Sequence, residues 1–166
     1  MGTLSHRAIR VEQDKEILLE FHCRINYESE TPYARRVPYG AYRRKWLSTE
    51  QPGSYLAHLA RTMSDPRTLA EIWEQDGTVV GHRWVVFRDV PDYGITIAEV
   101  MDLAVTPAFQ RQGLGRRMLQ HAEDVARKQG ATLLRSEAGS DNAASQRLHA
   151  SLEYRPYRIR YEKVLL

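Results

Sequence analysis

The order of hydrophobic and polar positions predicts an α/β protein built on a mixed sheet. Apolar side chains spaced by three or four residues predict helices after Asp14, over 39–47, over 53–63 and from Leu114 to Ala126. Alternating or continuous apolar runs predict strands over 8–11, 68–74, 78–88, 97–105, 132–137 and 157–164. A short helix is expected after Asn142. Because helices separate several strands, we expect one domain over 1–166, a sheet covered by helices.

Composition restricts the class of protein without naming a function. The 24 basic and 21 acidic residues give a net charge of +3, too small an excess to demand a nucleic-acid partner. The single Cys23 rules out an intrachain disulfide and suits a reducing, cytoplasmic setting. The sequence shows neither a signal peptide nor an apolar run long enough for a membrane. The histidines have no metal-ligand spacing with Cys23, so we expect no metal. The oligomeric state stays open, a homodimer included.

The segment between the strand at 97–105 and the following helix carries the strongest chemical signal. Pro107 ends the strand, and Gly113 and Gly115 precede the helix. The first N–H groups of a helix have no partner within it, and the helix dipole adds positive character there. Glycines let an anion approach the main chain, and Arg111 and Arg116 add cations. This order of elements predicts a phosphate-binding loop.

The loop matches neither the P-loop nor the dinucleotide-binding fingerprint, which needs glycine where Met118 stands. The pattern Gln110-x-x-Gly113-x-Gly115 after a Leu-x-Val strand resembles the acetyl-CoA loop of the GNAT superfamily of N-acetyltransferases. The order of elements over nearly the whole chain is similar to the GNAT fold. The resemblance implies an acetyl-CoA-dependent transferase that acts on the amine of a small molecule or peptide.

The resemblance also implies which residues bind the cofactor. The pantetheine arm would pair with Leu103, Ala104 and Val105, and the Leu103 N–H would face the acetyl carbonyl as an oxyanion donor. The diphosphate would bind the loop, and Asn142 fits a second family motif at the next helix start. The loop residues are Arg111, Gln112, Gly113, Leu114, Gly115 and Arg116.

Attack by an amine needs a neutral nitrogen, and hence a general base acting directly or through water. Glu99 matches the base of histone-type members, and Glu137 matches that of members acting on ribosomal proteins. Asp102 shares a strand with Glu99 and points the opposite way unless a bulge intervenes. His149 stands where the family often has a tyrosine that protonates the CoA thiolate, and Glu153-Tyr154 replaces Gly-Phe.

Each assignment has a simpler alternative. Glu99 and Glu137 could be ion-paired surface carboxylates, His149 a packed side chain, and Asn142 a helix cap. A basic cluster of Arg35, Arg36, Arg43, Arg44 and Lys45 is either a solvated helix face or part of an acceptor site for acidic amines. At the level of function, a non-catalytic acyl-CoA sensor and a nucleic-acid-binding module are the rivals. The identity of the acceptor stays open.

Overall fold

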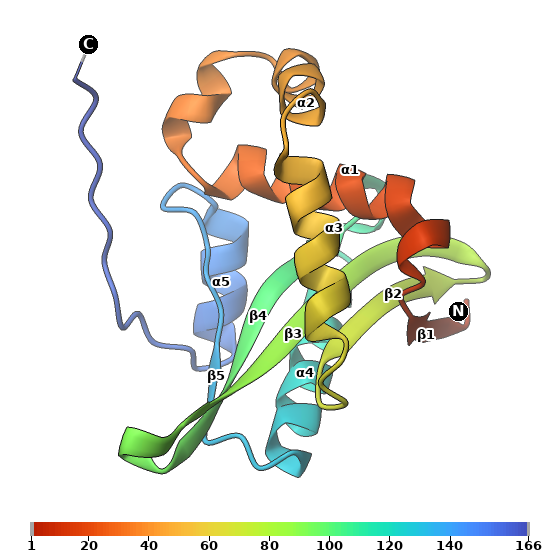
Figure 1. Cartoon of the computed structure of the whole chain (residues 1–166), viewed down its shortest axis with the longest axis vertical. Helices are drawn as coiled ribbons and strands as arrows, with labels where there is room; N and C mark the ends of the chain where they lie inside the picture. The colour runs from red at the N-terminus through yellow and green to blue at the C-terminus, as the bar shows by residue number, and fades with distance from the viewer. Residues whose placement is uncertain (1, 166) are drawn as a thin grey trace.

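In the computed structural model, which describes residues 2–165, a five-stranded sheet has the order β1-β2-β3-β4-β5. The first four strands each pair antiparallel with the next one in sequence. They are β1 (Leu4–Ala8), β2 (Leu69–Gln75), β3 (Thr78–Val90) and β4 (Ile95–Val105). Strand β5 (Leu133–Arg135) pairs parallel to β4. The predicted mixed sheet is confirmed, and Figure 1 shows its helices on both sides.

Two hydrophobic layers sandwich the sheet. Helices α1 (Val11–Ser29), α2 (Tyr39–Leu47) and α3 (Gln51–Thr62) follow β1, and Leu18 and Leu59 pack on Trp84 of β3. Helices α4 (Leu114–Lys128) and α5 (Ala143–Ser151) cover the other face, where Leu119 packs on Val85. Neighbouring residues of β3 therefore point to opposite layers, as strand geometry requires. None of the helices within 2–165 is long and apolar enough to cross a bilayer.

The N-terminal elements begin earlier than the sequence pattern predicts. The first strand spans Leu4–Ala8 and not 8–11, and α1 already begins at Val11. Asp14 is not the N-cap of this helix. Its carboxylate instead accepts the Arg10 backbone N–H at 2.7 Å and both Arg7 guanidinium nitrogens at 2.8 Å. The carboxylate thus stabilises the helix start from inside the first turns, which a capping pattern alone does not reveal.

The predicted closing strand at 157–164 is wrong. Residues 155–165 belong to no strand and are exposed, with Tyr161 89% and Ile159 73% accessible. The segment runs apart from the sheet in Figure 1. Its alternation of apolar and charged residues is typical of a half-buried strand, but the segment does not pair with β5, the strand at this edge of the sheet, and its apolar side chains stay exposed.

Helix α5 ends on a strained residue. Glu153 has φ +64°, and the Tyr154 N–H and Glu153 N–H bond back to the His149 and Ala150 carbonyls. These two bonds form a Schellman motif, whose left-handed position favours glycine. We expect Glu153→Gly to raise the free energy of unfolding by about 1 kcal/mol, measured by urea denaturation. Glu153→Ala is the matched control because it keeps the Cβ strain; an equal gain in both variants would contradict this explanation.

Candidate functional site

Strand β4 opens away from β5 halfway along its length. The two strands pair only from Ile97–Leu133 to Glu99–Arg135. On its other edge, β4 stays paired to β3 as far as Val105–Gly81, and Thr106 N–H donates to the Val80 carbonyl at 3.0 Å. Bonded and non-bonded pairs alternate in an antiparallel ladder, so the N–H and C=O of Leu103 and Val105 point away from β3. This stretch offers a free strand edge.

The loop after β4 presents main-chain N–H groups that the protein leaves free. Among the residues that the structure describes, no protein acceptor bonds the backbone N–H of any residue from Arg111 to Arg116. Arg111 and Gly113 both have positive φ, +60° and +79°, and no side chain caps α4. Successive N–H groups in such turns form concave sites for anions. The arrangement suits a diphosphate at the start of α4.

Side-chain hydrogen bonds hold this loop in place without using its free backbone N–H groups. Gln110 donates to the Val105 carbonyl and Gln112 to the Ala108 carbonyl, both at 3.1 Å. Arg116 reaches α5, where it donates to the Ser151 hydroxyl at 2.6 Å. Leu114 is buried and anchors the loop in the core. Gly115 lies where an added Cβ would meet Leu148 of α5 at 3.5 Å, so β4, the loop and α5 converge here.

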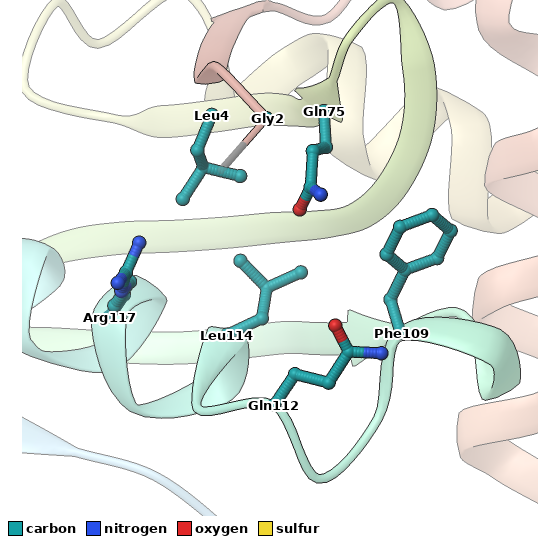
Figure 2. A pocket seen from close by; sticks show the side chains of 7 residues that line it. All are labelled: Gly2, Leu4, Gln75, Phe109, Gln112, Leu114 and Arg117. Carbon is teal, nitrogen blue, oxygen red and sulfur yellow. The ribbon is translucent and has the colours of Figure 1, made fainter.

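A hollow of about 430 Å³ borders the same loop from the β1–β2 side (Figure 2). Gln112, Leu114 and Arg117 form one wall of it, and Leu4 and Gln75 form the other. Leu103 and Val105 do not line it, and the free edge of β4 faces the β5 side instead. We therefore do not place the cofactor in this hollow.

Asn142 and His149, the two residues around α5 that correspond to the second family motif, have different surroundings. Asn142 is a helix cap, because its side-chain oxygen accepts the Ser145 N–H at 3.1 Å. His149 donates from Nδ1 to the Ser145 carbonyl at 2.7 Å, which leaves Nε2 buried without a partner in the described chain. The His149 ring also packs edge-on against Tyr154 at 5.2 Å between centroids. Packing and an acid role at Nε2 are both compatible with this arrangement.

A β-bulge at Met101 changes which residues of β4 share a face. Asp102 pairs with Trp84, whereas Val100 pairs with Val85, so Met101 has no opposite residue. Glu99 pairs with Val86, which lies on the same side of β3 as Trp84. Glu99 and Asp102 therefore both face α1 and α3, because the bulge, which is the exception to the opposite directions predicted for a regular strand, is present in this strand.

Asp102 forms a buried cluster with two histidines, which sequence reasoning missed. His22 of α1 lies 2.9 Å from the carboxylate through Nδ1, and His82 of β3 lies 3.3 Å away through Nε2. Burial opposes ionisation of Asp102, but the hydrogen bonds of both imidazoles outweigh it and keep its pKa below the usual range. The Tyr55 ring stacks on His22 with centroids 3.8 Å apart. No local spacing links these residues; only the bulge and the helix packing bring them together.

His22 and Asp102 of this cluster line a second pocket, of about 230 Å³, between α1, α3, β3 and β4. Met101, the bulged residue, and Asp102, directly before Leu103 in the strand, contribute to its lining. Its lining is aromatic and polar and contains one carboxylate but no lysine or arginine: His22, Gln51, Ser54, Tyr55, His58, Trp84, Met101 and Asp102.

The remaining sequence candidates lie elsewhere. The Glu137 side chain is 77% exposed and 3.8 Å from Arg160, away from this pocket. The basic cluster does not line the pocket either, since Arg35 pairs with Asp141 and Arg43 with Glu20. Its interpretation as a solvated face fits these contacts better than an acceptor site.

On the other face of the sheet, three side chains of the kinds that bind metal ions lie close together. Cysteine spacing in the sequence could not reveal this group. The ligand atoms of His6, Glu71 and His121 lie within 4.8 Å of one another. However, the buried Arg83 guanidinium bonds to Glu71 and lies 2.7 Å from His121 Nδ1. A cation of the protein itself therefore occupies the place that a metal would need.

Comparison with known proteins gives consistent results. Residues 26–154 match the model of the Acetyltransferase (GNAT) family. The [ribosomal protein bS18]-alanine N-acetyltransferase of Escherichia coli K12 is 41% identical over 63 residues, 38% of this chain and 43% of that protein. The L-methionine sulfoximine/L-methionine sulfone acetyltransferase of Salmonella typhimurium is 35% identical over 82 residues, 49% of this chain and 47% of that protein. The chain thus spans less than half the length of these curated relatives.

A solved structure supports the fold independently of sequence. A predicted acetyltransferase from Clostridium acetobutylicum, solved with acetyl-CoA, superposes with a TM-score of 0.71 at 11% identity, over 98% of this chain and 97% of that one. At this identity the likeness shows the fold alone. Together with the family match over most of its length, it shows that this chain belongs to the GNAT acetyltransferase family.

Proposed function

We propose that this protein transfers the acetyl group of acetyl-CoA to an amine by direct attack. The observation that carries the proposal is that a strand edge without a strand partner is followed directly by a loop whose N–H groups have no protein acceptor within 2–165. The free edge of β4 at Leu103–Val105 suits the amides of a pantetheine arm, and the free N–H groups from Arg111 to Arg116 suit its diphosphate. The family match and a relative solved with acetyl-CoA support this choice of cofactor.

The chemistry follows from the position of the strand edge. The Leu103 N–H points toward the open side and would stabilise the oxyanion that forms when the amine attacks the thioester. The acceptor would enter through the pocket on the α1–α3 face, which meets β4 beside Leu103. Because His149 Nδ1 donates to the Ser145 carbonyl, its Nε2 would first take up the second proton of the attacking nitrogen and then pass it to the departing thiolate. A direct transfer needs no acyl-enzyme, and burial raises the pKa of the Cys23 thiol, against its use as a nucleophile.

Two groups on the acceptor face could take the proton from the amine. Glu99 is the predicted base, is half-buried, and points to this face because it pairs with Val86. It lies four positions before Leu103 on the bulged strand, so it would act through a chain of water molecules and not by direct contact. Asp102 with His22 lies next to Leu103. Glu137, exposed on the far side of β5, is the weaker candidate.

The acceptor is an amine of a small molecule or of a peptide. The relatives' names describe one enzyme that acts on an alanine of a ribosomal protein and one that acts on methionine derivatives. From these names we carry over to this chain only that the acceptor is an amine.

The test is calorimetry with acetyl-CoA followed by release of CoA thiol over a panel of neutral, cationic and acidic amines. We expect saturable acetyl-CoA binding and turnover on at least one amine, with Glu99→Gln slowing turnover at unchanged acetyl-CoA affinity. Binding without turnover on any amine would favour the sensor of the same fold. Absence of acetyl-CoA binding would contradict the proposal itself.

A further inference from the structure

Asp102 is a carboxylate in the hydrophobic interior, a position that the stability of the fold alone does not favour. Its side chain is 1% exposed, in the layer where Trp84 and Leu59 pack. Burying a charge costs several kcal/mol unless hydrogen bonds compensate it. Here His22 and His82, from two different elements, make those bonds to the same carboxylate.

The two histidines differ in their access to the pocket. The His82 side chain is 0% exposed and sealed in the core, whereas the His22 side chain is 21% exposed and lines the pocket. Because the Asp102 carboxylate accepts this hydrogen bond, the His22 Nδ1 is the donor, and in the corresponding neutral tautomer the lone pair lies on Nε2. Stacking of Tyr55 on the ring fixes its orientation. Of the two histidines bonded to Asp102, only His22 lines the pocket.

The surroundings of His22 contain few other ionisable groups. Asp102 faces it from β4, His82 lies behind that carboxylate on β3, and Tyr55 and His58 line the pocket from α3. Burial and the Asp102 charge raise the pKa of Tyr55, so this phenol stays neutral. The aromatic ring of α2 nearest to His22 is Trp46, which carries no charge.

We propose, resting on the transferase function above, that His22 accepts the proton of the acceptor amine and that Asp102 is its positioning residue. The ammonium N–H bond breaks and its proton passes to Nε2, which leaves an imidazolium paired with Asp102. The neutral nitrogen then bonds to the thioester carbon as the carbon–sulfur bond breaks. The nitrogen still carries one proton more than the amide product, and this proton passes to the departing CoA thiolate, while the His22 proton returns to solvent.

The pocket also selects the acceptor. With a volume of about 230 Å³ it lies below the range of about 300–1,000 Å³ that holds drug-sized ligands, so it suits a compact amine or one residue of a peptide. Its lining offers aromatic faces and no lysine or arginine, so a carboxylate or phosphate on the acceptor would lack a cationic partner. The acceptor class is therefore a small amine without an acidic group at this end.

The test compares His22→Asn with the wild type on the best amine of the panel. Asparagine keeps a donor near the Nδ1 position but cannot act as a base, so the fold and acetyl-CoA affinity should persist. We expect kcat/KM to fall about 100-fold or more near neutral pH, to recover as pH approaches the ionisation of the free amine, and to rise with added imidazole. The Asp102→Asn variant should lower kcat/KM by a smaller factor and shift the pH dependence of kcat/KM. His6→Asn, an exposed histidine on β1, is the matched control and should keep the wild-type rate.

The outcomes distinguish a failure of the His22 assignment from a failure of the transferase function on which it rests. If the wild type neither binds acetyl-CoA nor turns over, the transferase function fails. If the wild type turns over and His22→Asn keeps its rate and pH profile, only the assignment to His22 is overturned, and loss in Glu99→Gln would then indicate transfer through water. Should His22→Asn not fold, nitrogen-15 NMR of wild-type imidazoles still decides: an Nε2–H tautomer of neutral His22 would overturn the proposal.

Discussion

Replacing Glu71 with alanine should lower the free energy of unfolding by about 3–5 kcal/mol, the largest stability effect that we expect from a single carboxylate. Arg83 lies in the middle of β3 with a side chain that is 0% exposed, and its guanidinium bonds to Glu71 and to the Met118 carbonyl. Burial lowers the pKa of Arg83, although the Glu71 charge acts in the opposite sense. Without Glu71 this charge would remain buried and unpaired.

Urea denaturation of three variants measures this effect. Glu74→Ala removes the carboxylate that pairs with the more exposed Arg7 at 3.0 Å, and should cost less than about 1 kcal/mol. The double variant Glu71→Leu with Arg83→Met removes both charges and should recover most of the loss. A Glu71→Ala variant as stable as Glu74→Ala would show that water or the His121 imidazole compensates Arg83, contrary to our account.

Placing a negative charge at Gly113 should weaken acetyl-CoA binding by about 10-fold to 100-fold, because like charges a few ångströms apart repel by a few kcal/mol near a protein surface. Gly113 has φ +79°, and an added Cβ would meet no atom within 4 Å. Asparagine and aspartate are the side chains that best tolerate this backbone region. Gly113→Asp and Gly113→Asn are therefore nearly equal in shape and differ in charge.

Calorimetry with acetyl-CoA on both variants isolates the electrostatic effect. We expect Gly113→Asn to bind within a few-fold of the wild type and Gly113→Asp to bind far more weakly, with similar melting curves. The difference should shrink at high salt, as an exposed charge interaction does. Equal affinities for both variants at low salt would mean that the diphosphate does not lie at the start of α4.

The sequence predicts the parts of this structure that local patterns determine. The Asp76-Gly77 turn has positive φ at both residues, and the Gly130 cap has φ +76°, as the turn residues indicate. The strands from β2 to β4 and the helices from α2 to α4 lie close to their predicted ranges. The loop from Arg111 to Arg116 follows from strand, glycine and helix in order, because helix geometry alone frees its amides.

The parts that the sequence does not predict depend on contacts between distant elements. A bulge at Met101 has no local signal, yet it turns Asp102 toward α1 and brings it within 2.9 Å of His22. Tyr55 joins them only because α3 packs on β3. The segment at 157–164 shows the reverse case: its alternation is typical of a strand, but it does not pair with β5 at the edge of the sheet.

The central claim is that main-chain amides between β4 and α4 hold the diphosphate of coenzyme A. The most direct measurement is an amide nitrogen–proton NMR spectrum of the wild type with acetyl-CoA and, separately, with acetyl-pantetheine, which lacks the diphosphate. We predict that the amide signals from Arg111 to Arg116 shift strongly with acetyl-CoA and little with acetyl-pantetheine, while those of Leu103 and Val105 shift with both. If acetyl-CoA binds and the signals from Arg111 to Arg116 stay in place, the claim is contradicted.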